Sequence, residues 1–355
     1  MRGKLSNLLL NETERIHHVK GVRSSPIYLR LDPSWACTLD CPFCHANLLK
    51  KRGFSRKEMN AGTFQNIMDR FGKDLIAARL GTWGEPFLNP AVTGYIRAMK
   101  EYGIHVSADS HLNHDWTDDD IGEIISSGLD LLVASIDGAT QESYVRYRKG
   151  GSLDRALENV RTIVQKKREI RRETPRIRWQ YLLFDWNEGE VEMARKLSEE
   201  SGCDEFVAKR GDTFEPYTPF LEYRDNSFMD SMTPGIRERM TRFCKERNEK
   251  KEYFGCDLLY HQLVIHADGS IHPCAYVHEP RVLYGSVHLK KDVFNTAHYK
   301  NARRLFIQPP PQECQGYNPC LNCTVVTDDH HEGYVPGDMD FFSAFELLTG
   351  EKLNV

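Results

Sequence analysis

The sequence has no long apolar stretch and no excess of basic residues. Its 355 residues carry a formal net charge of −4, and no apolar run approaches the roughly 20 residues that a membrane-spanning helix needs. Nucleic acids and anionic membranes usually select proteins with a basic excess. We therefore expect a cytoplasmic protein that binds neither nucleic acid nor a membrane.

The motifs of several common enzyme classes are also missing from the sequence. It contains no phosphate-binding loop, no dinucleotide-binding glycine fingerprint and no recognisable serine–histidine–acid set. The 14 histidines are scattered along the chain, and we expect them to lie on the surface. The chemistry must therefore come from other residue types.

What the sequence does contain is cysteine, with ten residues in total. In a reducing compartment, clustered thiols more often bind metal than form disulfides. Three of the cysteines lie close together near the N-terminus, and five lie between Cys256 and Cys323. This distribution indicates two separate cysteine sites.

Strand-like apolar runs alternate with helical periodicity between residues 27 and 211. We expect strands at residues 27–31, 75–80, 104–108, 129–136, 177–184 and 206–208, and helices at residues 63–71, 91–102, 118–126, 153–164 and 191–197. Such alternation predicts parallel strands joined by right-handed crossovers. Eight units would close a barrel, so six units favour an α/β fold built as a partial (β/α)6 TIM-like barrel.

The rest of the chain differs in composition from this alternating region. Asp268 and Gly269 separate two strand-like runs and predict a hairpin, and the periodicity of residues 293–306 predicts a helix. The other expected segments are an N-terminal extension (1–26), a linker and helix (212–250), a small α+β module (251–326) and a C-terminal tail (327–355).

Cys37, Cys41 and Cys44 directly follow the first expected strand. Iron–sulfur clusters are held by thiolates at short spacings, because one loop must surround one small cluster. Three thiolates leave one iron of a four-iron cluster open to an external ligand. A zinc site is the alternative, but it would normally need a fourth ligand nearby, and His45 is too close in sequence to supply one comfortably. The spacing favours iron–sulfur over zinc.

The gaps of three and two residues between these cysteines resemble the signature of the radical S-adenosylmethionine (SAM) superfamily. The resemblance covers about residues 27–211. It implies that Cys37, Cys41 and Cys44 hold a 4Fe-4S cluster whose open iron binds SAM. It also implies that Phe43, just before the last cysteine, meets the adenine with its backbone.

Two strand ends carry further parts of this resemblance. The segment around Gly84 and Glu85 is similar to the family's Gly-Gly-Glu motif, which implies that these two residues hold the methionine amino group. Trp83 stands where the first glycine of that motif often lies. Ser135 and Asp137 resemble the family's Ser-x-Asp-Gly ending, beside the cofactor ribose and carboxylate. Taken alone, the first segment reads as a turn and the second as a helix N-cap.

The resemblance also implies an arginine for the carboxylate of SAM. Arg148 is the candidate, although Arg146 competes equally on spacing. Residues 107–113 depart from the Thr-Asn-Gly of many relatives, so they receive no role from the resemblance. As polar residues at the mouth of a barrel strand, they are candidates for substrate contact.

Cys256, Cys274, Cys320 and Cys323 lie on either side of the expected hairpin and helix. Four thiolates can enclose a complete cluster, which is then structural or transfers electrons. A four-cysteine zinc site is the alternative. The arrangement resembles the twitch domain, the short form of the SPASM domain, and so implies one auxiliary 4Fe-4S cluster, with Cys314 as a spare that could replace a ligand.

The remaining thiols are Cys203, Cys244 and Cys314. We expect Cys203 to be a small buried hydrophobe. Cys244 and Cys314 are the candidates for a catalytic residue, because a positioned thiol could return a hydrogen atom to the opposite face of a substrate radical.

Together, the resemblances imply an oxidoreductase of the branch that includes the aminocyclitol dehydrogenase and the anaerobic sulfatase maturases. With two 4Fe-4S clusters, SAM and an external reductant such as flavodoxin or ferredoxin, we expect dehydrogenation of a small sugar-like or aminocyclitol-like substrate. Only 36 residues precede Cys37, which leaves no room for an N-terminal peptide-recognition domain and favours a small molecule over a peptide. The alternatives are a radical epimerase, a peptide- or protein-modifying maturase and, more remotely, a zinc-binding interaction protein.

Overall fold

The computed structural model describes residues 2–42, 44–51, 53, 57–210, 256, 258–275, 282–304 and 341–350. Its strands are β1 (Tyr28–Leu31), β2 (Ala77–Leu80), β3 (His105–Ser110), β4 (Leu131–Ser135), β5 (Arg176–Leu183), β6 (Glu205–Arg210), β7 (Gln262–Ile265), β8 (Ser270–His272) and β9 (Gly285–Ser286). The helices of the first part are α1 (Arg2–Ile16), α2 (His45–Lys51), α3 (Ala61–Phe71), η1 (Pro86–Leu88), α4 (Val92–Glu101), α5 (Asp118–Ser126), α6 (Gln141–Tyr147) and α7 (Leu153–Glu169). They are followed by η2 (Glu188–Glu190), α8 (Val191–Ser201), α11 (Leu258–His261), α12 (Ala297–Arg304) and α13 (Phe341–Thr349).

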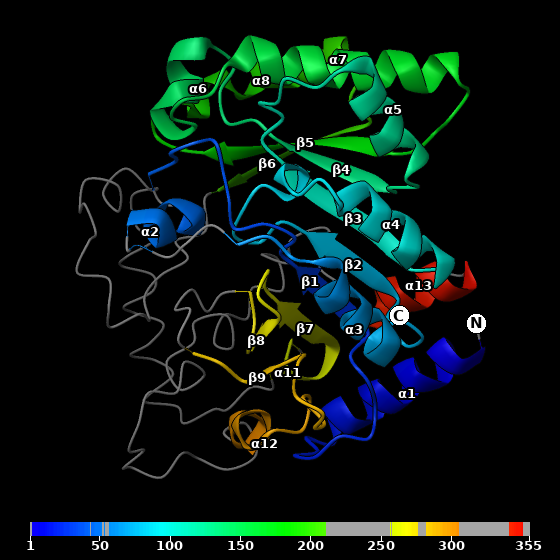
Figure 1. The fold of residues 1–355 in the computed structure, drawn as a ribbon. Helices are drawn as coiled ribbons and strands as arrows, with labels where there is room; N and C mark the ends of the chain where they lie inside the picture. Colours follow the sequence, from blue (N-terminus) through cyan, green and yellow to red (C-terminus); the bar gives the residue numbers. More distant parts are fainter. Residues whose placement is uncertain are drawn as a thin grey trace.

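The described strands form a single sheet in the order β6-β5-β4-β3-β2-β1-β7-β8-β9 (Figure 1). Neighbouring strands from β1 to β6 are all parallel, which confirms the predicted partial barrel. Alternate strand residues such as Leu29, Val106 and Leu132 join one apolar core with the covering helices. Their neighbours along each strand therefore face the inner side of the sheet.

Local sequence signals account for several helix boundaries. Thr117 caps α5 through a capping box with Asp120, as its position before the helix predicts. Gly202 ends α8 in the left-handed conformation, with φ of 80°, which a residue without Cβ adopts at little cost. Among the helices described, none is both long and apolar enough to cross a membrane.

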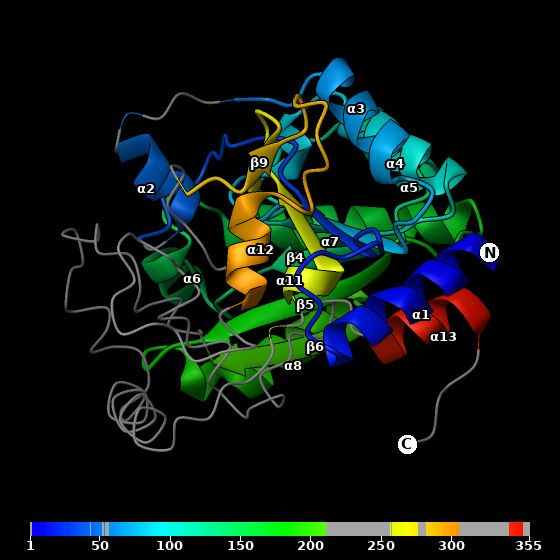
Figure 2. The same cartoon turned by 90° about the horizontal axis from the view of Figure 1, so that it is seen from below.

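Two helices cover the amino ends of the barrel strands. Both views show α1 and α13 side by side (Figures 1 and 2). Leu8 of α1 and Ala344 of α13 share a buried cluster with Ile27 and Ile76, which directly precede β1 and β2. The carboxyl ends of the strands form the opposite edge, where barrel folds place their active sites.

The hairpin predicted from Asp268 and Gly269 is present and extends the barrel sheet. β7 pairs in parallel with β1, and β8 returns antiparallel beside β7. Gly269 has φ of 78°, and an added Cβ there would lie 2.6 Å from the ring of His288. The module is thus joined to the barrel through backbone hydrogen bonds.

The helix expected from residue 293 begins later, at Ala297. The side chain of Asp292 accepts hydrogen bonds from the backbone N–H of Phe294 and the side chain of Asn295. These bonds hold a turn where the apolar periodicity suggested a first helical turn, because a short acidic side chain competes well for nearby N–H groups.

Candidate active site

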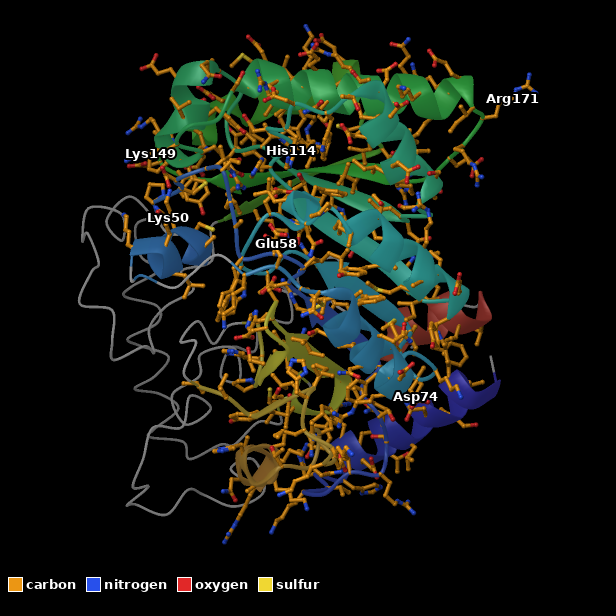
Figure 3. The ribbon with its side chains drawn as sticks, viewed as in Figure 1. Lys50, Glu58, Asp74, His114, Lys149 and Arg171 are labelled. Atoms are coloured by element: carbon orange, nitrogen blue, oxygen red, sulfur yellow. The ribbon has the colours of Figure 1, made fainter. Side chains whose placement is uncertain are left out.

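The loop that carries Cys37, Cys41 and Cys44 leaves the carboxyl end of β1 and is fixed on both sides. The backbone N–H of Glu85 donates to the carbonyl oxygen of Ala36 at 2.8 Å. The N–H of Asp40 donates to the carbonyl of Lys149 at 2.9 Å, and its side chain pairs with Lys50 at 2.8 Å. Figure 3 labels Lys50 and Lys149 on the two sides of this loop. The loop is thus held between the ends of β2 and α6.

Of the three thiols, Cys41 is buried and Cys37 and Cys44 are partly buried. Burial raises the pKa of Cys41 to about 12 against the opposing effect of Arg148, and it also raises the pKa values of Cys37 and Cys44. A metal site needs these side chains as thiolates, so binding of a metal would displace their protons.

Gly84 passes so close to the first strand's loop that only glycine fits. A Cβ added there would lie 2.0 Å from the carbonyl oxygen of Ser34. The next residue, Glu85, is 2% exposed, and its Oε2 accepts a hydrogen bond from the backbone N–H of His111 at 3.1 Å. The close approach therefore places a buried carboxylate beside the cysteine loop.

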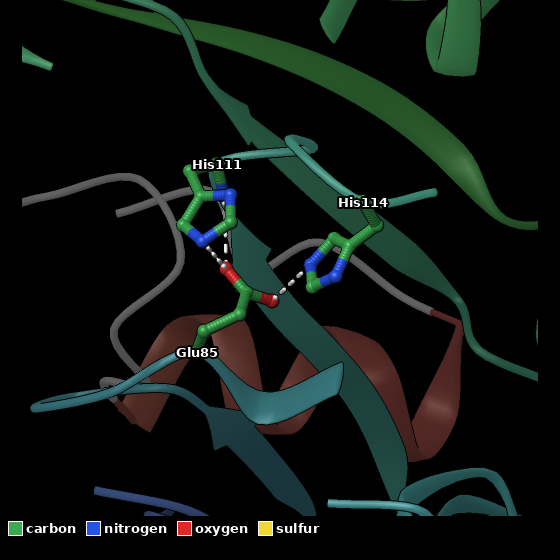
Figure 4. Close-up of side chains that lie close together, drawn as sticks. All are labelled: Glu85, His111 and His114. Atoms are coloured by element: carbon green, nitrogen blue, oxygen red, sulfur yellow. Dashed lines mark hydrogen bonds and ion pairs between the residues drawn. The ribbon is translucent and has the colours of Figure 1, made fainter. Parts of the chain in front are cut away.

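Two histidines that follow β3 surround this carboxylate (Figure 4). Nε2 of His111 lies 3.3 Å from Oε2 of Glu85, and Nε2 of His114 lies 3.2 Å from Oε1. Burial alone would raise the pKa of Glu85, but the two imidazoles and the His111 N–H lower it to about 2. Glu85 is therefore an ionised acceptor at neutral pH, suited to an ammonium group.

The protonation state of His111 distinguishes between a metal site and a carboxylate site. The backbone N–H of Asn113 donates to Nδ1 of His111 at 2.9 Å, and burial lowers the pKa of His111 to about 4. The neutral ring therefore carries its proton on Nε2, facing Glu85 and the hydroxyl of Thr38. A metal-binding histidine instead needs a lone pair on the ligating nitrogen and donates from the other. Although the donor atoms lie within 4.8 Å of one another, the arrangement is that of a buried carboxylate contacted by two imidazoles and hydrogen-bonded by the His111 N–H.

Asp137 and Arg148 form a second charged pair at the end of β4, two residues after Ser135. Nε of Arg148 donates to Oδ2 of Asp137 at 2.6 Å, and the backbone N–H of Leu182 donates to Oδ1 at 2.7 Å. Asp137 is fully buried and Ser135 is 8% exposed. Burial would lower the pKa of Arg148, but Asp137 beside it holds that pKa well above its ordinary value, so the guanidinium remains charged.

The two candidate arginines, Arg148 and Arg146, lie in different surroundings. Arg148 lies close enough to Cys41 to lower the pKa of its thiol against the effect of burial, so it lies at the cysteine loop. Arg146 instead lies over the ring of Trp186, 4.6 Å from its centroid. The geometry therefore places Arg148, and not Arg146, beside the cysteine loop.

Asp32, at the end of β1, joins this site to the hairpin. Its Oδ1 accepts from the backbone N–H groups of Thr82 and Trp83 at 2.5 and 3.0 Å. Its Oδ2 pairs with Nδ1 of His266, which follows β7. The Trp83 ring stacks on His266 with centroids 3.8 Å apart. The tryptophan that replaces a motif glycine is therefore packed against the hairpin.

The structure describes only half of the second cysteine set. Cys256 precedes α11 and Cys274 follows β8, and the antiparallel register of β7 and β8 places both near the same end of the hairpin. Cys203, predicted to be buried, is partly buried against the barrel core. Five other predicted site residues lie outside the described residues: Phe43, Cys244, Cys314, Cys320 and Cys323.

The expectation that histidines lie on the surface is wrong for five of those that the structure describes. These are less than 10% exposed: His111, His114, His261, His266 and His272. A signal was available for His111, which lies in the polar segment 107–113 at a barrel mouth, where barrel folds gather functional side chains. His266 lies just before the predicted hairpin turn at Asp268 and Gly269. Asp32 directly follows the first predicted strand.

Comparisons with known proteins agree with this geometry. The family described as "Radical SAM superfamily" matches residues 33–174, and no curated protein matches the sequence. The solved structure of Streptococcus suis SuiB with the precursor peptide SuiA has a TM-score of 0.55 at 16% identity, covering 91% of this chain and 74% of SuiB. The structure of anSMEcpe with bound AdoMet has a TM-score of 0.54 at 14% identity, covering 92% of this chain and 97% of that one.

The matched residues 33–174 contain the cysteine loop, Glu85 and the Asp137–Arg148 pair, and the similarity in fold extends over the barrel. Residues 33–174 therefore carry a radical SAM domain.

Proposed function

We propose that this protein is a radical SAM dehydrogenase that removes two electrons and two hydrogens from a small hydroxylated substrate, such as a sugar or an aminocyclitol. The observation that best supports the proposal is the convergence of three groups at the carboxyl edge of the sheet. The loop of Cys37, Cys41 and Cys44 is hydrogen-bonded both to Glu85 and to the residue after Arg148.

The chemistry of each group suits one part of a cluster-bound SAM molecule. The three cysteines would hold a 4Fe-4S cluster, Glu85 would accept from the ammonium, and Arg148 would pair with the carboxylate. Only Nε of Arg148 donates to Asp137. Because a guanidinium has five N–H donors in all, others would be left for the carboxylate of SAM. When bound, the reduced cluster and SAM supply a 5′-deoxyadenosyl radical that abstracts a hydrogen atom from the substrate.

The protein's own contribution is to orient the reactants and to exclude water. Glu85 and Asp137 are nearly or fully buried, so their interactions with bound SAM would be poorly screened. Burial of the site also protects a reactive radical from solvent, and close positioning decides which hydrogen is taken.

A dehydrogenase needs an acceptor for the second electron, and the hairpin module is our candidate. We propose that Cys256, Cys274, Cys320 and Cys323 hold an auxiliary 4Fe-4S cluster in a twitch-like module, with an external flavodoxin or ferredoxin as the reductant of the first cluster. Support comes from β7, which joins this module to the barrel sheet next to β1, the strand that leads into the first cysteine loop.

A peptide-modifying enzyme is the second candidate. SuiB was solved with the precursor peptide SuiA, and anSMEcpe was solved with the Cp18Cys peptide. Both resemble this chain in fold at low sequence identity, so a peptide substrate belongs in the test. A radical epimerase acting on a carbohydrate-like substrate is the third.

The test is anaerobic reconstitution with SAM and a reductant, followed by a panel of sugars, aminocyclitols and short peptides. We expect 5′-deoxyadenosine together with a small-molecule product two mass units lighter. A product of unchanged mass that acquires deuterium from heavy water would instead identify an epimerase. Turnover of peptides alone would identify a maturase.

A further inference from the structure

The turn that follows β3 has a backbone conformation that needs support from its surroundings. Leu112 lies between His111 and Asn113 with φ of 57°, in the left-handed region that a bulky side chain rarely adopts. Nδ2 of Asn159, on α7, donates to the carbonyl oxygens of Leu112 and His114 at 2.8 and 2.9 Å. Nδ2 of Asn113 donates to the carbonyl oxygen of His111 at 2.9 Å. Strained conformations that the surrounding structure fixes in this way are concentrated at functional sites.

Asn113 also reaches beyond the turn to α6. Its Nδ2 donates to the hydroxyl oxygen of Tyr144 at 2.7 Å, and its Oδ1 accepts from the backbone N–H of Ser152, which precedes α7, at 2.5 Å. Tyr144 is fully buried. A Cβ added to Gly151 would lie 2.9 Å from the Tyr144 ring and 3.2 Å from Oδ1 of Asn113. The junction is therefore closely packed and leaves the Asn113 side chain little freedom to move.

The two elements that Asn113 joins carry opposite ends of the proposed SAM site. On the turn, the backbone N–H of Asn113 donates to Nδ1 of His111 at 2.9 Å, and the backbone N–H of His111 donates to Glu85 at 3.1 Å. On α6, Tyr144 lies one helical turn before Arg148, whose backbone N–H donates to the carbonyl oxygen of Tyr144 at 2.8 Å. An unbroken series of hydrogen-bonded residues thus connects Glu85 with Arg148.

We propose that Asn113 is a positioning residue that fixes the separation between Glu85 and Arg148, so that the ammonium and carboxylate groups of one SAM molecule are bound together. The inference rests on the SAM site of the proposed function and not on the identity of the substrate. Both charged groups are attached to the same carbon atom of SAM, so a change in the separation of their protein partners weakens one of the two contacts. Partners that are already in place avoid the cost of ordering them on binding.

The test compares SAM with decarboxylated SAM, which keeps the ammonium group but lacks the carboxylate. Anaerobic titration calorimetry with reconstituted protein and an oxidised cluster measures both affinities without cleavage. We expect the wild type to prefer SAM by about 10-fold, as one charge-assisted contact implies. Tyr144→Phe deletes only the hydroxyl that accepts from Asn113. It should lower this preference to about threefold or less, while the affinity for decarboxylated SAM changes by less than about twofold.

Two substitutions in the turn complete the comparison. Asn113→Ala should lower the preference as Tyr144→Phe does, and the double variant should show no additional loss, because the bond between the turn and α6 is already absent. Asn159→Ala is the matched control. It removes two hydrogen bonds that hold the same turn, and neither involves α6. It should keep the wild-type preference for SAM, even where the free energy of unfolding falls.

Each outcome has a definite consequence. An unchanged preference in Tyr144→Phe and Asn113→Ala, or a wild type that binds both compounds equally, would overturn the inference and leave the SAM site standing. An equal loss of preference in Asn159→Ala would also overturn it, because the stability of the turn and not its contact with α6 would then matter. A wild type that binds no SAM would remove the SAM site itself, and the inference with it. If Asn113→Ala does not fold, Tyr144→Phe decides the question.

Discussion

Two buried groups, each of one carboxylate and two histidines, flank the mouth of the barrel. The Glu85 group consists of Glu85, His111 and His114, and the Asp32 group consists of Asp32, His266 and His272. In the first, both imidazoles lie within 3.3 Å of the carboxylate. In the second, only one histidine reaches it, and the other has no hydrogen-bond partner among the described residues.

The difference indicates different roles for similar side chains. In the Glu85 group both imidazoles lie beside the carboxylate, although Nε2 of His114 makes no hydrogen bond among the described residues. The group holds the pKa of Glu85 low, so the carboxylate stays ionised. The Asp32 group ties the loop around Trp83 to the hairpin and leaves one imidazole to interact with something else. Buried polar groups that lack partners usually mark an absent ligand or ion.

We expect the largest effect from cysteine substitutions, which should affect SAM cleavage differently at the two cysteine sites. Cys37→Ser removes a ligand of the first cluster, so 5′-deoxyadenosine formation should fall by about 1,000-fold or more, because the cofactor supplies the chemistry. Cys274→Ser should retain SAM cleavage but lose the oxidised product. Cys203→Ser, in the barrel core, is the control. Equal loss of SAM cleavage in the Cys37 and Cys274 variants would contradict the division of roles.

A second prediction concerns Gly84, which lies against the backbone of Ser34 beside the Glu85 group. Gly84→Ala would place a methyl group 2.0 Å from a backbone oxygen, so we expect a loss of about 2–4 kcal/mol in the free energy of unfolding and weak SAM binding. Gly94→Ala, on α4 with open space around it, should be neutral or stabilise slightly. Urea unfolding of both variants checks this, and similar stability in the two would show that the loop can move aside.

The third prediction is a pH dependence of the Glu85 group. The pKa of Glu85 is lowered from 4.5 to about 2 in the folded protein. Its ionised form therefore contributes stability that is fully present above pH 4.5 and is lost as the pH falls toward 2. A shift of this size corresponds to roughly 3 kcal/mol.

The stability advantage of the wild type over Glu85→Gln should accordingly shrink across that range. Denaturant unfolding of both proteins at several pH values measures it. If the free energy of unfolding varied with pH in the same way for the wild type and Glu85→Gln, Glu85 would not be held ionised by its neighbours.

The smallest expected effect distinguishes the two arginines. Arg148→Ala should weaken SAM binding by about 10-fold, because one charge-assisted interaction with the carboxylate is worth roughly 1.5 kcal/mol or more. Arg146→Ala should change it by less than about threefold, since Arg146 packs on Trp186. Titration calorimetry with the reconstituted protein checks both, and the reverse order would reassign the contact.

The sequence predicted the elements whose patterns are local. The six parallel strands, the longer helices between them and the hairpin at Asp268 and Gly269 follow from hydrophobic periodicity and turn residues. The short helices α2 and α6 were not predicted. Two terminal helices, α1 and α13, were not anticipated. Their buried residues, such as Leu8 and Ala344, pack on each other and on the amino end of the sheet, and contacts over such a distance leave no local pattern.

The candidate site was predictable only in part for the same reason. Short cysteine spacing and strand-end motifs mark residues close together in sequence. The carboxylate–histidine contacts do not have this property, since Asp32 and His266 are 234 residues apart. His111 was within a segment recognised as a barrel mouth, but its position on Glu85 depends on how β2 and β3 end beside each other.

The central claim is that Cys37, Cys41 and Cys44, together with Glu85 and the Asp137–Arg148 pair, form a site that cleaves SAM. The most direct measurement is metal content and SAM cleavage of anaerobically reconstituted protein. We predict about eight irons per chain, as two four-iron clusters require, and 5′-deoxyadenosine formed on reduction. Bound zinc without iron, or an iron-loaded protein that leaves SAM intact, would contradict the claim.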